Sequence, residues 1–142
     1  MLYPNPSRFK DFAMRLKGKV SIITGGASGI GKATVLKFAQ EGAIVAVCDL
    51  NQETIDATVN EVKAAGGEAV GYIVNVTNKS QINDMVADVK ARFGRIDVLV
   101  NNAGIVQDAQ LTKMTDEQFD LVIVINLRGV YNCAKAVVDT MV

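Results

Sequence analysis

The chain has 142 residues, 49% of them hydrophobic and 21% charged, and its fifteen basic and fifteen acidic residues cancel. This composition is ordinary for one globular domain. It offers no basic surface for nucleic acid and no apolar run that approaches the length of a bilayer span. The chain has no histidine and two distant cysteines, Cys48 and Cys133. We therefore exclude Ser-His-Asp triads, predict no metal site and no disulfide, and expect a reducing, cytoplasmic setting.

Residues 1–13 differ from the remainder of the chain. Positions 4–7 are turn-forming residues, and no apolar segment of the kind found in secretory signals follows them. Met14 begins a short segment that leads directly into the first apolar run. The sequence therefore predicts a leader or tag-like extension over residues 1–13, or an upstream start, and one folded domain over residues 14–142.

From Lys19 onward, short apolar runs alternate with segments of helical periodicity. The apolar runs predict strands at Val20–Thr24, Ala43–Cys48, Ala69–Val74 and Val98–Val100, and the periodic segments predict helices at Ile30–Glu41, Gln52–Ala65 and Ser80–Phe93. Thr115 has the pattern of a helix start. The stretch from Phe119 to Val142 that follows is expected to form two helices with a junction near Asn126 and Gly129.

This alternation predicts an α/β fold with helices on both faces of a parallel sheet. Right-handed crossovers restrict the topology to a doubly wound sheet of the Rossmann type, with the expected strand order 3-2-1-4. In such a sheet the ligand crevice lies between strands 1 and 4, outside their carboxyl ends.

A glycine-rich turn joins the first strand to the first helix, in the spacing Gly-x-x-x-Gly-x-Gly. We expect Gly25 to allow a tight turn, Gly29 to let the backbone approach a ligand, and Gly31 to let the helix pack closely on the strand. The first N–H groups of that helix and its positive dipole end would then face a pyrophosphate. A glycine cluster alone is also typical of a plain strand-to-helix turn.

Asp49 ends the second strand, eighteen residues after Gly31. A carboxylate near this spacing accepts hydrogen bonds from the adenosine ribose hydroxyls and repels a 2′-phosphate. The glycine turn contains no Arg or Lys, and Ser28 stands where a cation could pair with that phosphate. These features favour NAD over NADP. The alternative is that Asp49 caps the following helix, a role for which Asn51 competes.

A further motif, Asn101-Asn102-Ala103-Gly104, directly follows the fourth strand. With the glycine turn, Asp49 and the stretch 125–130, it makes the chain resemble the short-chain dehydrogenase/reductase family, from about Met14 to the last residue. Within that family the chain is similar to 3-oxoacyl-(acyl-carrier-protein) reductases.

The resemblance implies a nicotinamide cofactor and a set of residues that bind it. The implied cofactor residues are Thr24, Gly25, Ser28, Gly29, Ile30, Gly31, Asp49, Leu50, Asn75, Val76, Asn102, Ala103 and Gly104. Asn126 corresponds to one member of the family's catalytic tetrad, where it helps to hold a proton-relay water. The family often has Asp where this chain has Asn75, and an amide oxygen can still accept a hydrogen bond from the adenine amino group.

The family's catalytic Ser, Tyr and Lys lie beyond a fifth strand. Sixteen residues follow Asn126, fewer than the roughly 30 of another strand–helix unit, so we expect this chain to end before that active site is complete. A product of these residues alone is expected to be poorly soluble or associated. Tyr131 and Lys135 have Tyr-x-x-x-Lys spacing, but we interpret Tyr131 as a packing or interface residue.

The resemblance implies an oxidoreductase that transfers hydride between a nicotinamide and a ketone or secondary alcohol. The expected substrate is a small or acyl-carrier-bound carbonyl compound, as in fatty acid biosynthesis, and the full-length protein is expected to be a homo-oligomer, a tetramer or dimer. Two alternatives stay open. The chain could be a module that binds a dinucleotide without turnover, or a structural fragment with neither property.

Overall fold

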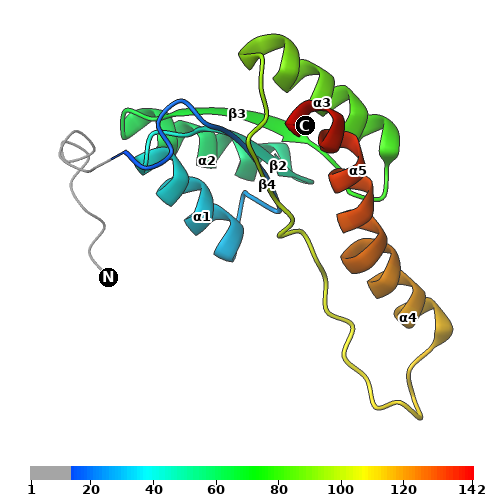
Figure 1. The fold of residues 1–142 in the computed structure, drawn as a ribbon. Helices are drawn as coiled ribbons and strands as arrows, with labels where there is room; N and C mark the ends of the chain where they lie inside the picture. Colours follow the sequence, from blue (N-terminus) through cyan, green and yellow to red (C-terminus); the bar gives the residue numbers. More distant parts are fainter. Residues whose placement is uncertain (1–13) are drawn as a thin grey trace.

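The computed structural model describes residues 14–142, so the extension expected over residues 1–13 lies outside the described residues. Strands and helices alternate along the chain (Figure 1). The elements are β1 (Val20–Thr24), α1 (Gly29–Gln40), β2 (Ile44–Asp49), α2 (Gln52–Ala64), β3 (Glu68–Ile73), α3 (Lys79–Phe93), β4 (Val98–Val100), α4 (Asp116–Ile123), a π-helical segment η2 (Val124–Arg128) and α5 (Gly129–Met141). The predicted strands and the first three helices are all present, and their ends agree to within one residue.

The four strands form one parallel sheet in the order β3-β2-β1-β4, which confirms the predicted topology. Ile23 of β1 lies opposite Val47 of β2 on one side and opposite Val100 of β4 on the other. Every residue of β1 is buried. Strands buried on both faces have continuous apolar runs, and that is why the strand positions could be predicted from the sequence.

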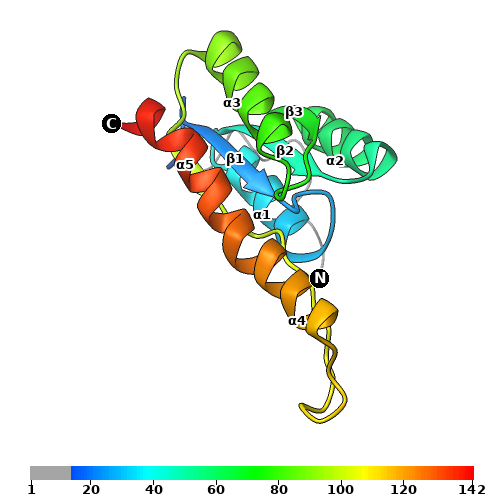
Figure 2. The same ribbon diagram turned by 90° about the vertical axis from the view of Figure 1, so that its right-hand side faces the viewer.

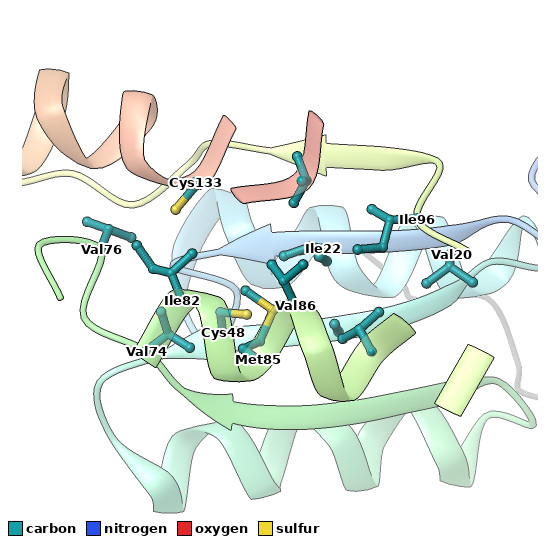
Figure 3. Packing of buried hydrophobic residues seen from close by; sticks show 13 residues of the cluster. Val20, Ile22, Cys48, Val74, Val76, Ile82, Met85, Val86, Ile96 and Cys133 are labelled. Carbon is teal, nitrogen blue, oxygen red and sulfur yellow. The ribbon is translucent and has the colours of Figure 1, made fainter. Parts of the chain in front are cut away.

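Helices cover both faces of the sheet (Figure 2). Alternate strand residues point to opposite faces, so Val45 and Val47 pack with α1 and α2 in one cluster, while Ala46 and Cys48 pack with α3 and α5 in the other. Figure 3 shows the second cluster, in which Cys133 of α5 lies over the same face as Cys48. Two separate apolar cores therefore hold the strand ends in fixed positions.

The first described residues are attached to the end of α1 through Glu41, which is 5% exposed. Its carboxylate accepts a hydrogen bond from the Arg15 guanidinium (2.8 Å) and lies 2.9 Å from the Lys37 ammonium. These two cationic partners lower the pKa of Glu41 to about 2. The ionised carboxylate thus holds the segment before β1 against the end of α1.

The stretch after β4 departs from the prediction, because α4, η2 and α5 form one continuous helix rather than two helices. At the expected junction the Gly129 N–H donates a hydrogen bond to the carbonyl of Val124. The helix therefore continues through a π-helical turn and does not break at this point. Gly129 is needed there for close contact. A Cβ on Gly129 would lie 2.6 Å from Val76 Cγ2.

The length of this helix also corrects the expectation that no apolar run is long enough to span a bilayer. Within residues 14–142, one helix of 26 residues, Asp116–Met141, is long and apolar enough to cross a membrane by length and composition. The sequence analysis missed it because it divided the stretch in two. Core helices, which are mostly buried, pass the same test; of the apolar window in this helix 22% is buried, and Cys133 and Val137 are among the residues that pack against the sheet.

Candidate functional site

The three motifs of the sequence meet in one cavity of about 530 Å³ at the carboxyl ends of the strands. Parallel strands end at the same edge of their sheet, so the turns after β1, β2, β3 and β4 are brought together. The lining residues are Gly25, Ser28, Gly29, Ile30, Asp49, Leu50, Val74, Asn75, Val76, Asn102, Ala103, Gly104, Ile105 and Ile125. Eleven of the fourteen predicted site residues are in this list, and Thr24, Gly31 and Asn126 are not.

A larger cleft of about 690 Å³ lies beside β3, where residues of α2 and α3 flank the strand. Its lining includes Glu68, the first residue of β3, and Lys63 and Arg92. It therefore extends to the amino end of that strand, whereas ligands of open parallel sheets bind outside the carboxyl ends. The smaller cavity is the candidate site.

The glycine turn leaves the start of α1 open to this cavity. The N-cap residue Ser28 makes no side-chain capping bond, so the first N–H groups of the helix remain available to an anion. Gly29 has φ +52°, and a Cβ placed on it would meet no atom within 4 Å. The space beside Gly29 is therefore open for a ligand, as the sequence predicts.

Gly31 is buried because the turn folds back over it. A Cβ on Gly31 would overlap the carbonyl oxygen of Gly25 and lie 2.5 Å from Asn102 Nδ2. The close contact predicted for Gly31 is thus present, but it is made with the turn and the loop after β4 rather than with a strand.

Thr24 and Asn102 join β1 to the loop after β4. The Thr24 hydroxyl accepts hydrogen bonds from the backbone N–H groups of Asn102 (3.1 Å) and Ala103 (3.0 Å), and Thr24 is 1% exposed. Asn102 Nδ2 donates to the carbonyls of Thr24 and Gly25, both at 3.1 Å. Thr24 therefore lies behind the cavity and holds the loop after β4 against the end of β1, where the glycine turn begins.

Asp49 ends β2 and contacts the glycine turn. Its Oδ2 accepts from the Ala27 N–H (2.9 Å), and its Oδ1 accepts from the N–H of Leu50 (2.8 Å). The alternative role as a helix cap is wrong, because the N-cap of α2 is Asn51, whose side chain accepts from the Thr54 N–H. Each carboxylate oxygen keeps a second lone pair that can accept from a ligand hydroxyl.

Asn75 lines the cavity, but its side chain is already engaged. Its Oδ1 accepts from the backbone N–H of Thr77 (2.9 Å) and from the Thr77 hydroxyl (2.7 Å). An amide oxygen has two lone pairs, and both are used here. The Oδ1 atom, which we expected to accept a hydrogen bond from an adenine amino group, is therefore already engaged. The Nδ2 group of Asn75 can still donate a hydrogen bond to a ligand.

Asn126 lies in η2, beside the cavity. Its Oδ1 accepts from the Ile105 N–H and its Nδ2 donates to the Ile105 carbonyl, both at 2.8 Å. This pair of bonds fixes the loop after β4 against the helix. Gly104 passes close by, since a Cβ there would lie 3.2 Å from Asn126 Oδ1.

Sequence reasoning missed three residues of the lining, Val74, Ile105 and Ile125. The signal available for all three was adjacency, because Val74 precedes Asn75, Ile105 follows the Asn-Asn-Ala-Gly motif and Ile125 precedes Asn126. Among residues 14–142, no group of three or more His, Cys, Asp or Glu side chains is placed to hold a metal ion.

Comparisons with known proteins identify the family. A family model described as short chain dehydrogenase matches residues 19–142. The chain belongs to the short-chain dehydrogenase family. It is 52% identical over 129 residues to a 3-oxoacyl-[acyl-carrier-protein] reductase, FabG, of Thermotoga maritima, covering 91% of this chain and 52% of that protein.

Other relatives of this short-chain dehydrogenase chain carry different names. The chain is 41% identical to subunit BbsD of a (2S)-[(R)-hydroxy(phenyl)methyl]succinyl-CoA dehydrogenase of Thauera aromatica, covering 91% of this chain and 52% of that protein. A crystal structure of a short-chain dehydrogenase/reductase from Burkholderia xenovorans superimposes with a TM-score of 0.86 at 35% identity, covering 89% of this chain and 52% of that one. The chain spans about half the length of the relatives it matches.

Proposed function

We propose that this protein is a nicotinamide-dependent oxidoreductase and that these residues bind the cofactor. The observation that carries the proposal is the convergence of the open start of α1, Asp49 and the 102–104 segment on one cavity. The α1 amides would bind the pyrophosphate, and Asp49 would accept from the ribose hydroxyls. When bound, the cofactor supplies hydride to a carbonyl carbon or takes it from a secondary alcohol.

We propose NAD rather than NADP as the preferred cofactor. Among the described residues that line the cavity, Asp49 is the only charged one, and its carboxylate would repel a 2′-phosphate. Lys32, which follows the glycine turn, is paired with Glu61 of α2 at 2.7 Å. A 2′-phosphate would therefore meet a negative charge without a neighbouring cation to offset it.

The cofactor proposal is tested by titrating the protein with NADH and with NADPH while following nicotinamide fluorescence. NADH should bind more tightly, and Asp49→Ala should weaken NADH binding and reduce the ratio of the two dissociation constants. Asp84→Ala is the matched control, since it removes the same charge from an exposed position of α3. Tighter binding of NADPH by the unaltered protein would refute the preference.

We propose a 3-oxoacyl thioester as the substrate, because the Thermotoga maritima relative is a 3-oxoacyl-[acyl-carrier-protein] reductase by name. The assay is the loss of NADH absorbance on addition of the N-acetylcysteamine thioester of 3-oxobutanoic acid. Binding of NADH with no turnover of this or other ketones would instead favour the alternative of a dinucleotide-binding module.

We also propose that the protein forms a homo-oligomer through its long C-terminal helix. Tyr131 is 60% exposed, so the packing interpretation is not supported within this chain and the interface interpretation remains. Leu127, Val130 and Val138 are exposed on the same helix, and an apolar surface of this kind is typical of contact with another subunit. Light scattering coupled to size exclusion should show an oligomer; a monomer at micromolar concentration would contradict it.

A further inference from the structure

The segment 74–76, which follows β3, forms one wall of the cofactor cavity. It lies next to Asp49, because the Val74 N–H donates to the backbone carbonyl of that residue (2.9 Å). The adenosine half of a dinucleotide held through Asp49 would therefore contact this wall. Val74 and Val76 are buried in the same apolar cluster as Cys133 of α5 (Figure 3).

The backbone of Asn75, in the middle of this wall, is fixed by α3 and its N-cap. The Asn75 N–H donates to Gln81 Oε1 of α3 (2.8 Å), and the Asn75 carbonyl accepts from the N–H of Asn78 (2.9 Å). The Val74 N–H is bonded to β2 through Asp49. What remains is the end of the wall at Val76, and this residue is held from α5.

The helix α5 contacts Val76 at two points on one face. Asn132 Nδ2 donates to the Val76 carbonyl (3.0 Å), and the two residues are 5% and 7% exposed. Gly129 lies three residues earlier, on the same face of the helix, where an added Cβ would lie 2.6 Å from Val76 Cγ2. Within residues 14–142 no other group donates to the Val76 carbonyl. One buried side-chain bond therefore fixes the direction of this peptide group.

The amide of Asn132 is only half engaged. Its Oδ1 atom is buried, and no group within the described part of the chain donates to it. A buried acceptor without a partner is unfavourable, whereas leucine, which has the same branched arrangement of heavy atoms, would carry no such cost. The favourable contribution of Asn132 therefore lies in the bond from its Nδ2 atom to the wall of the cavity.

We propose that Asn132 is a positioning residue for the cofactor, which holds the 74–76 wall in the arrangement that receives the adenosine half. The assignment rests on the proposed function. Without the Nδ2 donor the Val76 carbonyl would be buried and unpaired, and it would regain a partner by turning toward water in the cavity. The wall would then have to be re-formed on binding, which lowers affinity.

The test is the variant Asn132→Leu, measured with two ligands. NADH is titrated by nicotinamide fluorescence, and ADP-ribose, which lacks the nicotinamide ring, is titrated by calorimetry. Loss of one hydrogen bond corresponds to about a 2- to 10-fold loss of affinity. Both dissociation constants should rise by this amount and by the same factor, because the two ligands share the adenosine half. Stability in urea should change little, since one unpaired buried oxygen replaces another.

Two further variants separate positioning from general packing. Val137→Ala is the matched control, because Val137 is a buried residue of the same helix, 2% exposed. It should lower stability in urea and leave both dissociation constants unchanged. Gly129→Ala moves the wall through the Val76 side chain instead of its carbonyl. It should also raise both dissociation constants, and it tests the assignment independently of whether Asn132→Leu folds.

The outcomes separate this assignment from the proposed function. If the unaltered protein binds NADH and Asn132→Leu binds it equally well, the assignment is overturned and the cofactor proposal stands. An equal loss of affinity in Val137→Ala, or a loss for NADH without one for ADP-ribose, would also overturn it. If ADP-ribose binds but neither NADH nor NADPH does, and only Asn132→Leu and Gly129→Ala weaken it, the proposed function fails and the role of Asn132 stands.

Discussion

Replacement of Gly31 by alanine should destabilise the protein, although alanine is the better helix former. Gly31 lies in the first turn of α1, and its φ is not in the left-handed region, so alanine would introduce no backbone strain. The added methyl group would overlap the Gly25 carbonyl oxygen and approach Asn102 Nδ2 to 2.5 Å. The conflict is therefore one of space alone.

The sign of the change in folding stability depends on two opposing contributions, helix propensity and overpacking. Glycine to alanine in a helix interior is worth about 0.8–1 kcal/mol in favour of folding. Overpacking of a filled site costs about 1–3 kcal/mol, and the upper part of that range applies because one colliding atom belongs to the backbone. We expect a net loss of about 1–2 kcal/mol, which corresponds to a Tm lower by roughly 3–10 °C for a chain of this size.

The assay is urea unfolding followed by circular dichroism, combined with NADH titration of the folded protein. Ala33→Gly is the matched control, because Ala33 is an exposed position of the same helix and its loss of stability measures helix propensity alone. Affinity for NADH should fall with Gly31→Ala, since the glycine turn must move. A variant that is more stable than the unaltered protein and binds NADH equally well would refute the packing argument.

Three further outcomes follow from the structure. Because the pKa of Glu41 is lowered to about 2, its stabilising effect is present above its ordinary value near 4.5 and is lost as pH falls toward 2; Glu41→Gln should therefore flatten the decline of urea stability between pH 5 and 2. Thr115→Ala removes the capping box with Gln118 and should cost about 0.5–2 kcal/mol in the same unfolding assay. Burial raises the pKa of Cys133 to about 11 and raises that of Cys48 further. Ellman's reagent at pH 8 should thus react with both thiols in urea and with neither in the native protein.

Most of the fold could be predicted because a buried parallel strand has a distinctive sequence. Val20–Thr24 and the inner residues of Ile44–Asp49 are buried on both faces, so their apolar residues do not alternate with exposed polar ones. The helix after Thr115 was predicted less well, because Asn126 and Gly129 have the composition of a break. Packing overrides that local preference, since Gly129 must approach Val76 closely and a helix passing that point satisfies this contact.

The candidate site could be predicted wherever the chemistry depends on backbone geometry or on a strand end. Gly29 and Asp49 belong to this class, and both line the cavity. For Asn75, the sequence reasoning left local competition for its amide oxygen out of account. An Asn followed two residues later by Thr can bond to that residue's backbone, and here Thr77 occupies the amide oxygen that a ligand would need.

The π-helical turn connects the packing of the helix to the chemistry of the site. Each residue inserted into an α-helix rotates everything beyond it by about 100°. Cys133 and Val137 of α5 are fixed against the sheet, so the extra residue in η2 sets the direction in which Asn126 and α4 point. With it, the Asn126 amide meets both backbone groups of Ile105. The turn therefore allows one unbroken helix to pack on the sheet and, at the same time, to hold the loop after β4 beside the candidate site.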